Sequence, residues 1–384
     1  MRILVVPPAF PYPGNSVPFV FVLRQCQALA ARGHAVEVAY VVPAAPPISA
    51  KWRAYRSIPT SYIYEGVPVI VMRALVPPKM LNLQAVRRQV RPQLQAIIAR
   101  LQPDIVHVHC LVPPGFFTVG LAKPVLLTAH GSDVYLYPRQ RADLLAAAVT
   151  ALETPRVVVA VSEFIKREVQ QLKARDVRVI YNGADPRIFV PADRAAARAV
   201  LGLHSERPVV AYAGTIARFK GLFELVQAAQ RLAALQPQVV LAGSGPDTAE
   251  LRSAFRTSRV EATFLGALPQ GQVAKMFAAA DVVTLPSHAE GLPTVICEAM
   301  LSGRAVVTTP VGGLPEIVRD GETGLLTPVG DDAALAGALR RVLTDSSLRT
   351  QMEANALEFA SRHLTWSANA RAYEAVYSEL LSAG

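Results

Sequence analysis

The sequence predicts an α/β protein made of two doubly wound, Rossmann-like domains. Short β-branched runs bounded by Pro, Gly or Asp alternate with longer Ala/Leu/Arg-rich segments of helical period. The length of 384 residues suits two cores. A polar stretch with two prolines near 184–193 breaks the pattern, which then restarts. We expect an N-terminal domain at 1–185, a C-terminal domain at 186–365, and a C-terminal helix at about 366–384 that returns to the first domain.

In the first half, apolar β-branched runs predict seven strands. They cover residues 2–6, 35–42, 67–72, 104–109, 124–129, 156–161 and 177–181. Helices are expected between several of them, for example at 18–32 and at 163–173, where Ser162 is suited to cap the N-terminus.

The second half repeats the alternation. Strands are expected at 208–212, 238–243, 262–266, 281–286 and 304–309, and helices at 221–235, 246–257, 270–279 and 293–302. From about residue 331 the chain shows three helical segments and no further strand.

Composition restricts the class of protein. Hydrophobic residues make up 52% and charged residues 18% of the chain, which is typical of a well-packed globular protein. The three cysteines, Cys26, Cys110 and Cys297, are far apart and form no CxxC pair, so neither a disulfide framework nor a zinc site is expected. The sequence has no run of about 18 uncharged apolar residues, so no membrane span is expected. These features favour a reducing, cytoplasmic compartment.

Charge is distributed unevenly. Residues 1–185 contain 21 Lys and Arg and 10 Asp and Glu, net +11, whereas residues 186–384 contain 18 and 19, net −1. The basic half suggests an anionic membrane surface as a partner and a peripheral location on its inner face, while an ordinary Arg-rich surface remains an equal alternative. Nucleic acid is not expected, because no recognition motif accompanies the charge. Arg87, Arg88 and Arg91 look like the edge of an amphipathic helix, for which we favour domain packing over membrane contact.

Four loops of the second domain follow predicted strands, where open α/β sheets bind ligands. In the first loop, AGTIARFKG (213–221), Arg218 and Lys220 are two residues apart, so an extended loop would point both side chains the same way. Two cations beside a helix N-terminus form a suitable clamp for a diphosphate. A solvated loop with two surface cations is the alternative.

Two further loops are rich in glycine. LAGSGP (241–246) contains Gly243 and Gly245, which would let the backbone approach a ligand, and Ser244, which could hydrogen-bond to it. Gly-Ser-Gly turns are also common without a ligand, so this loop alone is a weak signal. TPVGGLPEIVRDGETG (309–324) contains Gly312 and Gly313 in a similar setting, although a simple turn explains it nearly as well.

The remaining loop leads into a predicted helix at 293–302. Pro293 suits its first position and Gly303 its C-terminal end, so the amides around Leu292 and Thr294 would face an anionic phosphate. Glu290 precedes the helix, and Glu298 lies about 7 Å along its axis. Glu298 stands on an otherwise apolar helix, where an unpaired carboxylate is costly. The two carboxylates could bind hydroxyl groups on either side of a bound diphosphate.

Taken together, these motifs resemble the family 4 retaining glycosyltransferases, also called group 1 glycosyltransferases, of GT-B fold. The resemblance rests on the Glu-x7-Glu element EGLPTVICE, the RFKG loop and LAGSGP in the second half, and on PYPGNSVPFVFV (11–22), TAHGSD (128–133) and YNGAD (181–185). It covers most of the chain and thins over residues 43–100 and after 330. It implies two Rossmann-like domains that face a cleft, an acceptor side in the first domain and nucleotide-sugar binding in the second.

The resemblance also implies roles for individual residues. Arg218 and Lys220 would hold the diphosphate, Glu298 the ribose and Glu290 the transferred sugar. His130 would position that sugar, and Gly14 would lie in a loop near the phosphates and the acceptor. Without the resemblance, a hydrogen bond from His130 to a turn is an even alternative. The catalytic candidates are therefore His130, Arg218, Lys220 and Glu290. The other residues expected to bind the donor are Gly14, Gly214, Gly243, Ser244, Gly245, Gly291, Leu292, Pro293, Thr294 and Glu298.

Two positions depart from the family pattern. Many members have Gly-Phe-Gly after the first Glu, where this chain has Gly291, Leu292 and Pro293. Phe19 stands where similar N-terminal loops often have Gly, which affects the shape of the acceptor mouth. Among the other histidines, we expect His107 to be a core residue. For His109, a position in the core and a position at the edge of the cleft are equal alternatives.

The expected reaction is transfer of a sugar from a UDP-sugar or GDP-sugar to a glycan or lipid-linked acceptor. No Asp-x-Asp occurs, so Arg218, Lys220 and the helix amides would stabilise the leaving diphosphate without metal or cofactor. The resemblance favours a front-face route with retention, in which a phosphate oxygen takes the acceptor proton. A nucleotide-sugar 2-epimerase of the same fold and a non-catalytic nucleotide-sugar-binding subunit are the alternatives.

Overall fold

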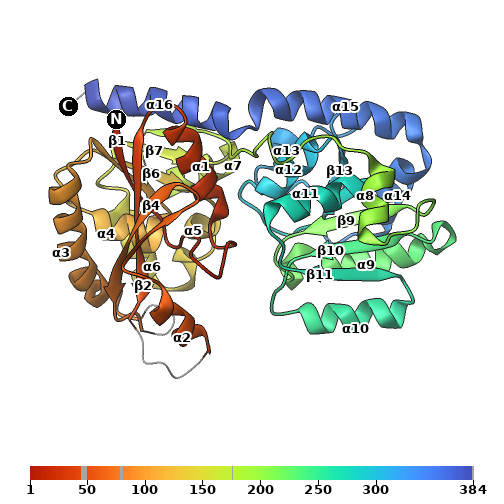
Figure 1. The fold of residues 1–384 in the computed structure, drawn as a ribbon, viewed down its shortest axis with the longest axis horizontal. Helices are drawn as coiled ribbons and strands as arrows, with labels where there is room; N and C mark the ends of the chain where they lie inside the picture. Colours follow the sequence, from red (N-terminus) through yellow and green to blue (C-terminus); the bar gives the residue numbers. More distant parts are fainter. Residues whose placement is uncertain (45–49, 78–80, 175, 383–384) are drawn as a thin grey trace. The chain divides into compact units, whose positions relative to one another are not determined.

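The chain folds into two units, each with its own parallel sheet (Figure 1). The computed structural model describes residues 1–44, 50–77, 81–174 and 176–382. Unit 1 comprises Met1–Tyr181 and Asn369–Gly384, and unit 2 comprises Asn182–Ala368. The sequence placed the first boundary after residue 185 and the start of the returning helix at 366. Of that helix, residues 383–384 lie outside the described residues.

The described residues of unit 1 form an eight-stranded sheet. Its strands are β1 (Arg2–Val6), β2 (Ala35–Pro43), β3 (Ser61–Tyr64), β4 (Val67–Ala74), β5 (Ile105–His109), β6 (Val125–Ala129), β7 (Val157–Ala160) and β8 (Val177–Val179). They lie in the order β3-β4-β2-β1-β5-β6-β7-β8. All described pairs are parallel except β3 with β4. The seven predicted strands are therefore present, and β3 is an antiparallel edge strand that the sequence analysis missed.

Helices separate these strands. They are α1 (Val20–Ala30), α2 (Ala50–Ser57), α3 (Leu83–Leu101), α4 (Phe116–Thr118), α5 (Ser132–Tyr135), α6 (Ala142–Ala151) and α7 (Glu163–Gln171), with short non-α turns at Leu111–Gly115 and Pro138–Gln140. Ser162 caps α7 as predicted, because its hydroxyl accepts from the amide of Ile165.

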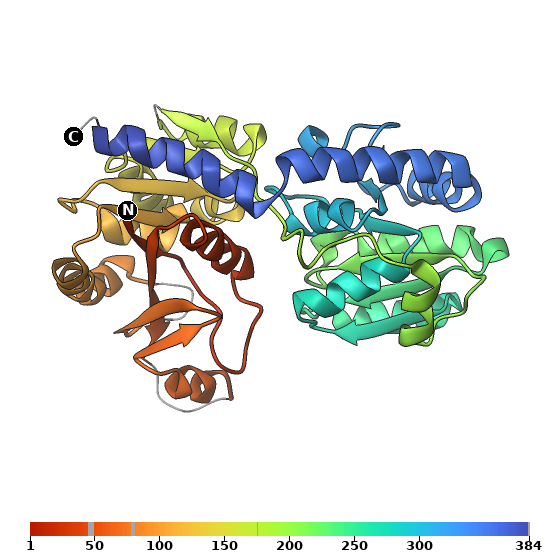
Figure 2. The same ribbon diagram turned by 45° about the horizontal axis from the view of Figure 1, so that its top comes forward.

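The last helix, α16 (Trp366–Ser382), returns to unit 1 (Figure 2). Tyr373, Val376 and Tyr377 are buried in the same core cluster as side chains of β1, β2 and α1. The side-chain amide of Gln25 in α1 donates to Oδ1 of Asn369 at 2.9 Å. The C-terminal segment is therefore part of the core of unit 1.

Unit 2 contains six strands, β9 (Val209–Ala213), β10 (Gln238–Ala242), β11 (Ala262–Gly266), β12 (Val282–Leu285), β13 (Ala305–Thr308) and β14 (Leu325–Leu326). Their order is β11-β10-β9-β12-β13-β14, and the described pairs are all parallel. Most of these strands read as continuous buried runs, as expected for a parallel sheet with helices on both faces.

The helices of unit 2 are α8 (Arg194–Leu201), α9 (Leu222–Arg231), α10 (Thr248–Ser258), α11 (Gln270–Ala279), α12 (Thr294–Leu301), α13 (Leu314–Ile317), α14 (Asp332–Thr344) and α15 (Ser346–His363), with 3-10 turns at Arg218–Lys220 and Ala233–Leu235. The three helical segments expected after residue 331 are α14, α15 and α16. No helix in the described ranges is long and apolar enough to cross a membrane.

Candidate active site

The strand order of unit 2 identifies one position where a ligand site is expected. From β9 the chain moves outward to β10 and β11, and it then returns to the other side of β9 with β12. Such a reversal separates the loops after β9 and β12 and opens a crevice at their carboxyl ends. These two loops contain Arg218, Lys220 and Glu290.

Lys220 and Glu290 form an ion pair at this position. The Nζ of Lys220 lies 2.6 Å from Oε1 of Glu290, and the two side chains are only 15% and 9% exposed. Ser287 donates its hydroxyl to the same carboxylate oxygen at 2.6 Å. Glu290 is thus held by a cation and a hydroxyl, and its position is determined before any ligand arrives.

Arg218 is placed differently. Residues 218–220 form a 3-10 turn, so the two side chains do not share one direction as an extended loop would require. Arg218 is 64% exposed and pairs with Glu250 of α10, and its guanidinium lies 4.6 Å from the centroid of the Phe223 ring. The prediction of a common direction was therefore wrong. The turn ends at Gly221, where a Cβ would lie 1.9 Å from the carbonyl oxygen of Pro286.

Glu298 lies on α12 and is also buried. Its Oε1 accepts a hydrogen bond from the side-chain amide of Gln270 at 2.9 Å, and Gln270 is the first residue of α11. The helix begins at Thr294, so Pro293 is its N-cap, with ψ of 119°, and the prediction that Pro293 is the first helical residue was wrong by one position. Gly303 follows the C-cap with φ of 63°, as predicted.

The glycine-rich loops contact one another through their backbones. The amide of Gly214 donates to Ala242, and the amide of Ile216 donates to Ser244. A Cβ at Gly243 would lie 1.8 Å from the carbonyl oxygen of Gly214. Close packing between neighbouring loops therefore requires glycine here, whereas the sequence analysis had attributed it to the approach of a ligand.

The other loops around α12 follow the same principle. A Cβ at Gly312 would lie 2.1 Å from the carbonyl oxygen of Glu290, and the amide of Gly313 donates to Gly291 at 2.7 Å. Leu292 is buried, and its carbonyl accepts from the side chain of Asn182. The loop after β13 thus fixes the loop that contains Glu290.

His130 lies in unit 1, after β6, and is part of a row of histidines. Its Nε2 lies 2.9 Å from Nδ1 of His109, and the two rings are stacked with centroids 5.1 Å apart. His109 in turn stacks on His107, and Nε2 of His107 is 2.8 Å from the hydroxyl of Thr128. His107 is a core residue, as expected.

Burial controls the charge of this row. It lowers the pKa of His130 and of His107 to about 3, and it holds the pKa of His109 well below the usual value, with help from the neighbouring imidazoles. Nδ1 of His130 is buried and has no hydrogen-bond partner among the described residues. A neutral His130 can exchange a hydrogen bond with a hydroxyl group, but it supplies no positive charge at pH 7.

The N-terminal loop of unit 1 contains two left-handed residues. Gly14 has φ of 96°, and no atom lies within 4 Å of the position that a Cβ would take. Phe19 has φ of 50° and caps α1, and Phe21 lies against His130 with ring centroids 5.0 Å apart. The backbone at residue 19 has a left-handed conformation that favours glycine, and this chain has Phe there.

Several residues that hold the predicted ones were not predicted from the sequence. Ser287 lies only three positions before Glu290, so its proximity was a usable signal. Gln270 lies 28 positions from Glu298, and Glu250 lies 32 positions from Arg218. No local sequence pattern connects the residues of either pair. No cluster of three His, Cys, Asp or Glu suited to a metal ion occurs in the part of the chain that the structure describes.

Comparison with known families agrees with this geometry. The family described as "Glycosyl transferases group 1" matches residues 193–359, and "Glycosyltransferase Family 4" matches residues 19–188. A D-inositol 3-phosphate glycosyltransferase of Nocardia farcinica is 31% identical over 397 aligned positions, which cover 94% of this chain and 84% of the relative. The chain belongs to the group 1, family 4 glycosyltransferases. Members of this class transfer a sugar from a nucleotide sugar with retention.

Solved structures share the fold of this glycosyltransferase. Sucrose-phosphate synthase from Thermosynechococcus elongatus is similar with a TM-score of 0.84 and 25% identity, and the match covers 100% of both chains. Anabaena HepE in complex with UDP-glucose has a TM-score of 0.77 and 22% identity, with both chains fully covered. The GT-B assignment made from the sequence is confirmed.

Proposed function

We propose that this glycosyltransferase transfers a hexose from a UDP-sugar or GDP-sugar to a glycan or lipid-linked acceptor, without metal and by front-face attack. The observation that carries the proposal is the placement of Lys220 and Glu290 in the two loops at the switch point of unit 2. Lys220 would bind the diphosphate, and Glu290 would accept hydrogen bonds from the transferred sugar. UDP is the first nucleotide to test, because HepE was solved with UDP-glucose.

Departure of the nucleoside diphosphate determines which charges are needed. As the bond between the anomeric carbon and the phosphate oxygen breaks, negative charge develops on the diphosphate, and buried cations stabilise it better than exposed ones. Lys220 is buried at this point, whereas Arg218 is exposed and must leave Glu250 to reach a phosphate. We therefore assign the larger share of charge stabilisation to Lys220.

Retention follows from attack on the face that the leaving group vacates. The acceptor oxygen forms its bond to the anomeric carbon while the bond to the phosphate oxygen breaks, and that phosphate oxygen takes the acceptor proton. His130, neutral and held by His109, would hydrogen-bond a hydroxyl of the sugar. Glu298 would bind the ribose, and the glycine loops would shape the remaining donor site.

The first experiment is a thermal-shift screen with UDP, GDP, ADP and their common sugar conjugates, each with and without EDTA. A ligand that binds only the folded state raises the melting temperature. We expect a shift with one diphosphate that EDTA leaves unchanged. A shift that EDTA abolishes would contradict the metal-free clamp, and no shift with any nucleotide would contradict donor binding itself.

Substitutions test the assigned residues. Arg218→Ala, Lys220→Ala and Glu298→Ala should each abolish turnover while the circular dichroism spectrum is kept, and near wild-type activity in all three would refute the assignment.

Transfer is distinguished from epimerisation by whether the donor is consumed without an acceptor. Donor consumption should require an acceptor. Conversion of the nucleotide sugar in the absence of an acceptor would support the 2-epimerase activity and contradict glycosyl transfer.

Contact with an anionic membrane is a separate part of the proposal, supported by the net charge of +11 over residues 1–185. The arginines of α3 contribute less than expected, because Arg87 and Arg91 donate to the carbonyl oxygen of Val119. Arg88 is exposed. Sedimentation with anionic liposomes should pellet the protein at low salt, and a protein that stays in the supernatant would contradict this part.

A further inference from the structure

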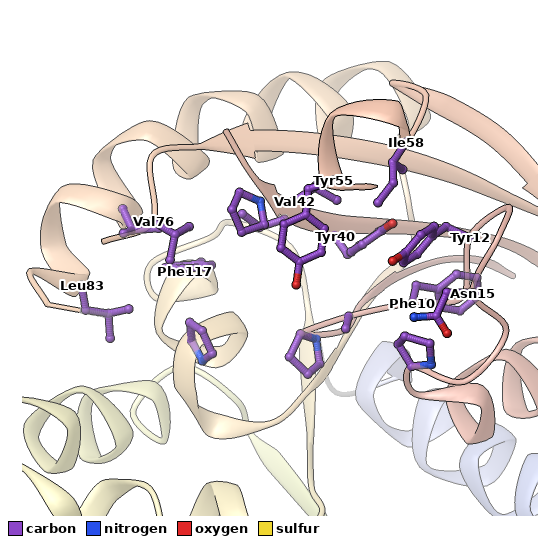
Figure 3. Close-up of a pocket in the computed structure, with 17 residues that line it drawn as sticks. Phe10, Tyr12, Asn15, Tyr40, Val42, Tyr55, Ile58, Val76, Leu83 and Phe117 are labelled. Atoms are coloured by element: carbon purple, nitrogen blue, oxygen red, sulfur yellow. The ribbon is translucent and has the colours of Figure 1, made fainter. Parts of the chain in front are cut away.

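Unit 1 contains a pocket at the switch point of its own sheet (Figure 3). β1 lies between β2 and β5, so the chain reverses its direction across the sheet at this point. Phe10 from the loop after β1, Val42 at the end of β2 and Pro113 from the loop after β5 all line the pocket. Its volume is about 300 Å³. A concave site of this size at a switch point is where an α/β unit binds a small ligand.

The wall of the pocket is apolar. Among the described residues that line it, most are proline, aliphatic or aromatic, and the polar side chains are those of three tyrosines and one asparagine. No Lys, Arg, His, Asp or Glu is among the described residues that line it. A charged group that entered this pocket would lose its hydration without gaining an ionic partner.

The tyrosine nearest the centre of the sheet presents its ring rather than a free hydroxyl. The hydroxyl of Tyr40 lies 3.1 Å from that of Tyr62, which donates to the carbonyl oxygen of Pro11 at 2.8 Å. Tyr40 therefore uses its hydroxyl within the protein. In Figure 3, Phe10 and Tyr12 lie toward one end of the pocket, and Val76 and Leu83 lie toward the other.

One chain segment that supplies part of the wall is rich in cations. Residues 44–100 contain nine Lys and Arg and one Asp or Glu. On α2, Tyr55 lines the pocket, while its neighbours Arg53 and Arg56 are exposed. The guanidinium of Arg73 donates to the carbonyl oxygens of Tyr55 and Ile58 and fixes these two wall residues. An uncharged interior thus adjoins a helix with exposed cations.

We propose that this pocket binds the hydrocarbon chain of an anionic amphiphile that serves as the acceptor. The inference rests on the proposed function, since an acceptor is needed only if unit 2 supplies a sugar. The chain would occupy the apolar interior, and the anionic group would lie near Arg53 and Arg56. This choice selects a lipid-linked acceptor over a free glycan.

The test compares four small probes by isothermal titration calorimetry. Octyl phosphate and octyl glucoside share a chain, and inorganic phosphate and methyl glucoside supply the corresponding heads alone; all are used below any micelle concentration. Each buried methylene changes affinity by up to about fourfold. We expect both octyl compounds to bind at least tenfold more tightly than their heads, with octyl phosphate the tighter at low salt and the difference reduced at high salt.

A pair of neighbouring substitutions gives a matched control. Val76 lines the pocket, whereas Leu75 beside it is 64% exposed and does not. Val76→Asp should weaken octyl binding at least tenfold, and Leu75→Asp should leave it within twofold. Val76→Phe, which keeps the wall apolar but reduces the volume, should make affinity stop rising at a shorter chain in a butyl, hexyl and octyl series.

Three results would overturn the proposal. They are equal affinity for octyl and methyl glucoside, equal loss in the Val76→Asp and Leu75→Asp variants, and absence of octyl binding by the wild-type chain. Donor binding measured by thermal shift on the same samples separates this inference from the proposed function. Donor binding without octyl binding refutes the pocket assignment alone, and octyl binding without donor binding refutes the proposed function.

Discussion

The ion pair between Lys220 and Glu290 shows how one residue can serve both stability and ligand binding. Both side chains are nearly buried, and Glu290 is also held by Ser287. Removal of the cation would leave a buried carboxylate that lacks its ionic partner, which is more costly than the loss of an exposed pair. Activity alone would therefore not distinguish a binding role from a structural one.

A double substitution makes this distinction. Lys220→Met should lower the free energy of unfolding of unit 2 by about 3 kcal/mol, because the buried carboxylate of Glu290 loses its ionic partner. Adding Glu290→Gln should restore most of the stability, while donor binding stays lost in both variants. Hydrogen exchange of β9 and β12 measures the stability, and thermal shift with the diphosphate measures binding. Equal stability of the single and double variants would contradict this account.

Arg218 presents the opposite case, since its pair with Glu250 is exposed on both sides. Such pairs contribute at most about 1 kcal/mol. Glu250→Gln should leave stability unchanged and tighten diphosphate binding about two- to fivefold, because Arg218 no longer has to leave a carboxylate. Glu322→Gln, which removes the exposed partner of Arg319, is the matched control and should change neither quantity. Weaker binding in the Glu250 variant would show that Glu250 helps to place Arg218.

The sequence could predict which residues carry charge but not where their side chains point. Arg218 and Lys220 were recognised from their spacing and setting, yet a 3-10 turn sends them to different partners. Glu250, Gln270 and His109 hold site residues that are distant in sequence, or on another strand. Such contacts depend on how strands and helices pack, which no local pattern records.

Among the elements, the strands of the two sheets were the most predictable part of the fold. Their apolar runs are bounded by Pro, Gly and Asp, and short length and β-branched residues distinguish them from buried helices. β3 was missed because SYIY is short and alternates between exposed and half-buried residues at the edge of the sheet. β14 was missed because it has only two residues. The helix α12 was predicted nearly in full, and only its first residue was displaced, by Pro293.

The glycine loops after β9 and β10 provide a test at this scale. Gly243→Ala would bring a Cβ against the carbonyl oxygen of Gly214, so the two loops would have to separate. We expect a melting temperature lower by several degrees and weakened donor binding. Gly271→Ala is the control, because that helical position is open and alanine is the better helix former. Unchanged donor binding in the Gly243 variant would show that these loops do not shape the donor site.

The histidine row on β5 and β6 predicts a pH dependence. The folded pKa values of His107 and His130, about 3, lie below the unfolded value of about 6.5, so the unfolded chain binds more protons between these limits. The stability of unit 1 should be complete above pH 6.5 and fall as the pH decreases toward 3. Hydrogen exchange of β5 and β6 should show this fall, with a smaller slope in His107→Gln than in the exposed His204→Gln control. Parallel slopes would contradict the assignment.

At the scale of the whole molecule, the return of α16 to unit 1 is the main feature. The sequence predicted a helix here, but its packing in the core of unit 1 comes from the structure. Tyr377 donates its hydroxyl to Nδ1 of His107 or accepts from it at 2.7 Å, and Tyr373 lies 2.9 Å from the hydroxyl of Thr128. The helix therefore supports the strands that hold the histidines. A chain that ends at Ala368 should lose the protection of β1, β5 and β6 in hydrogen exchange and keep that of unit 2. Retained protection in unit 1 would show that α16 is dispensable.

This arrangement also affects how the protein is made. Domains usually fold in order as they leave the ribosome. Here the core of unit 1 includes Tyr373 and Tyr377, so its first 181 residues must wait, incomplete, until all of unit 2 has been synthesised. Unit 2, which is continuous in sequence, can close first. The unit that begins the chain is therefore expected to be the last to finish folding, and its apolar strands are exposed to chaperones throughout that interval.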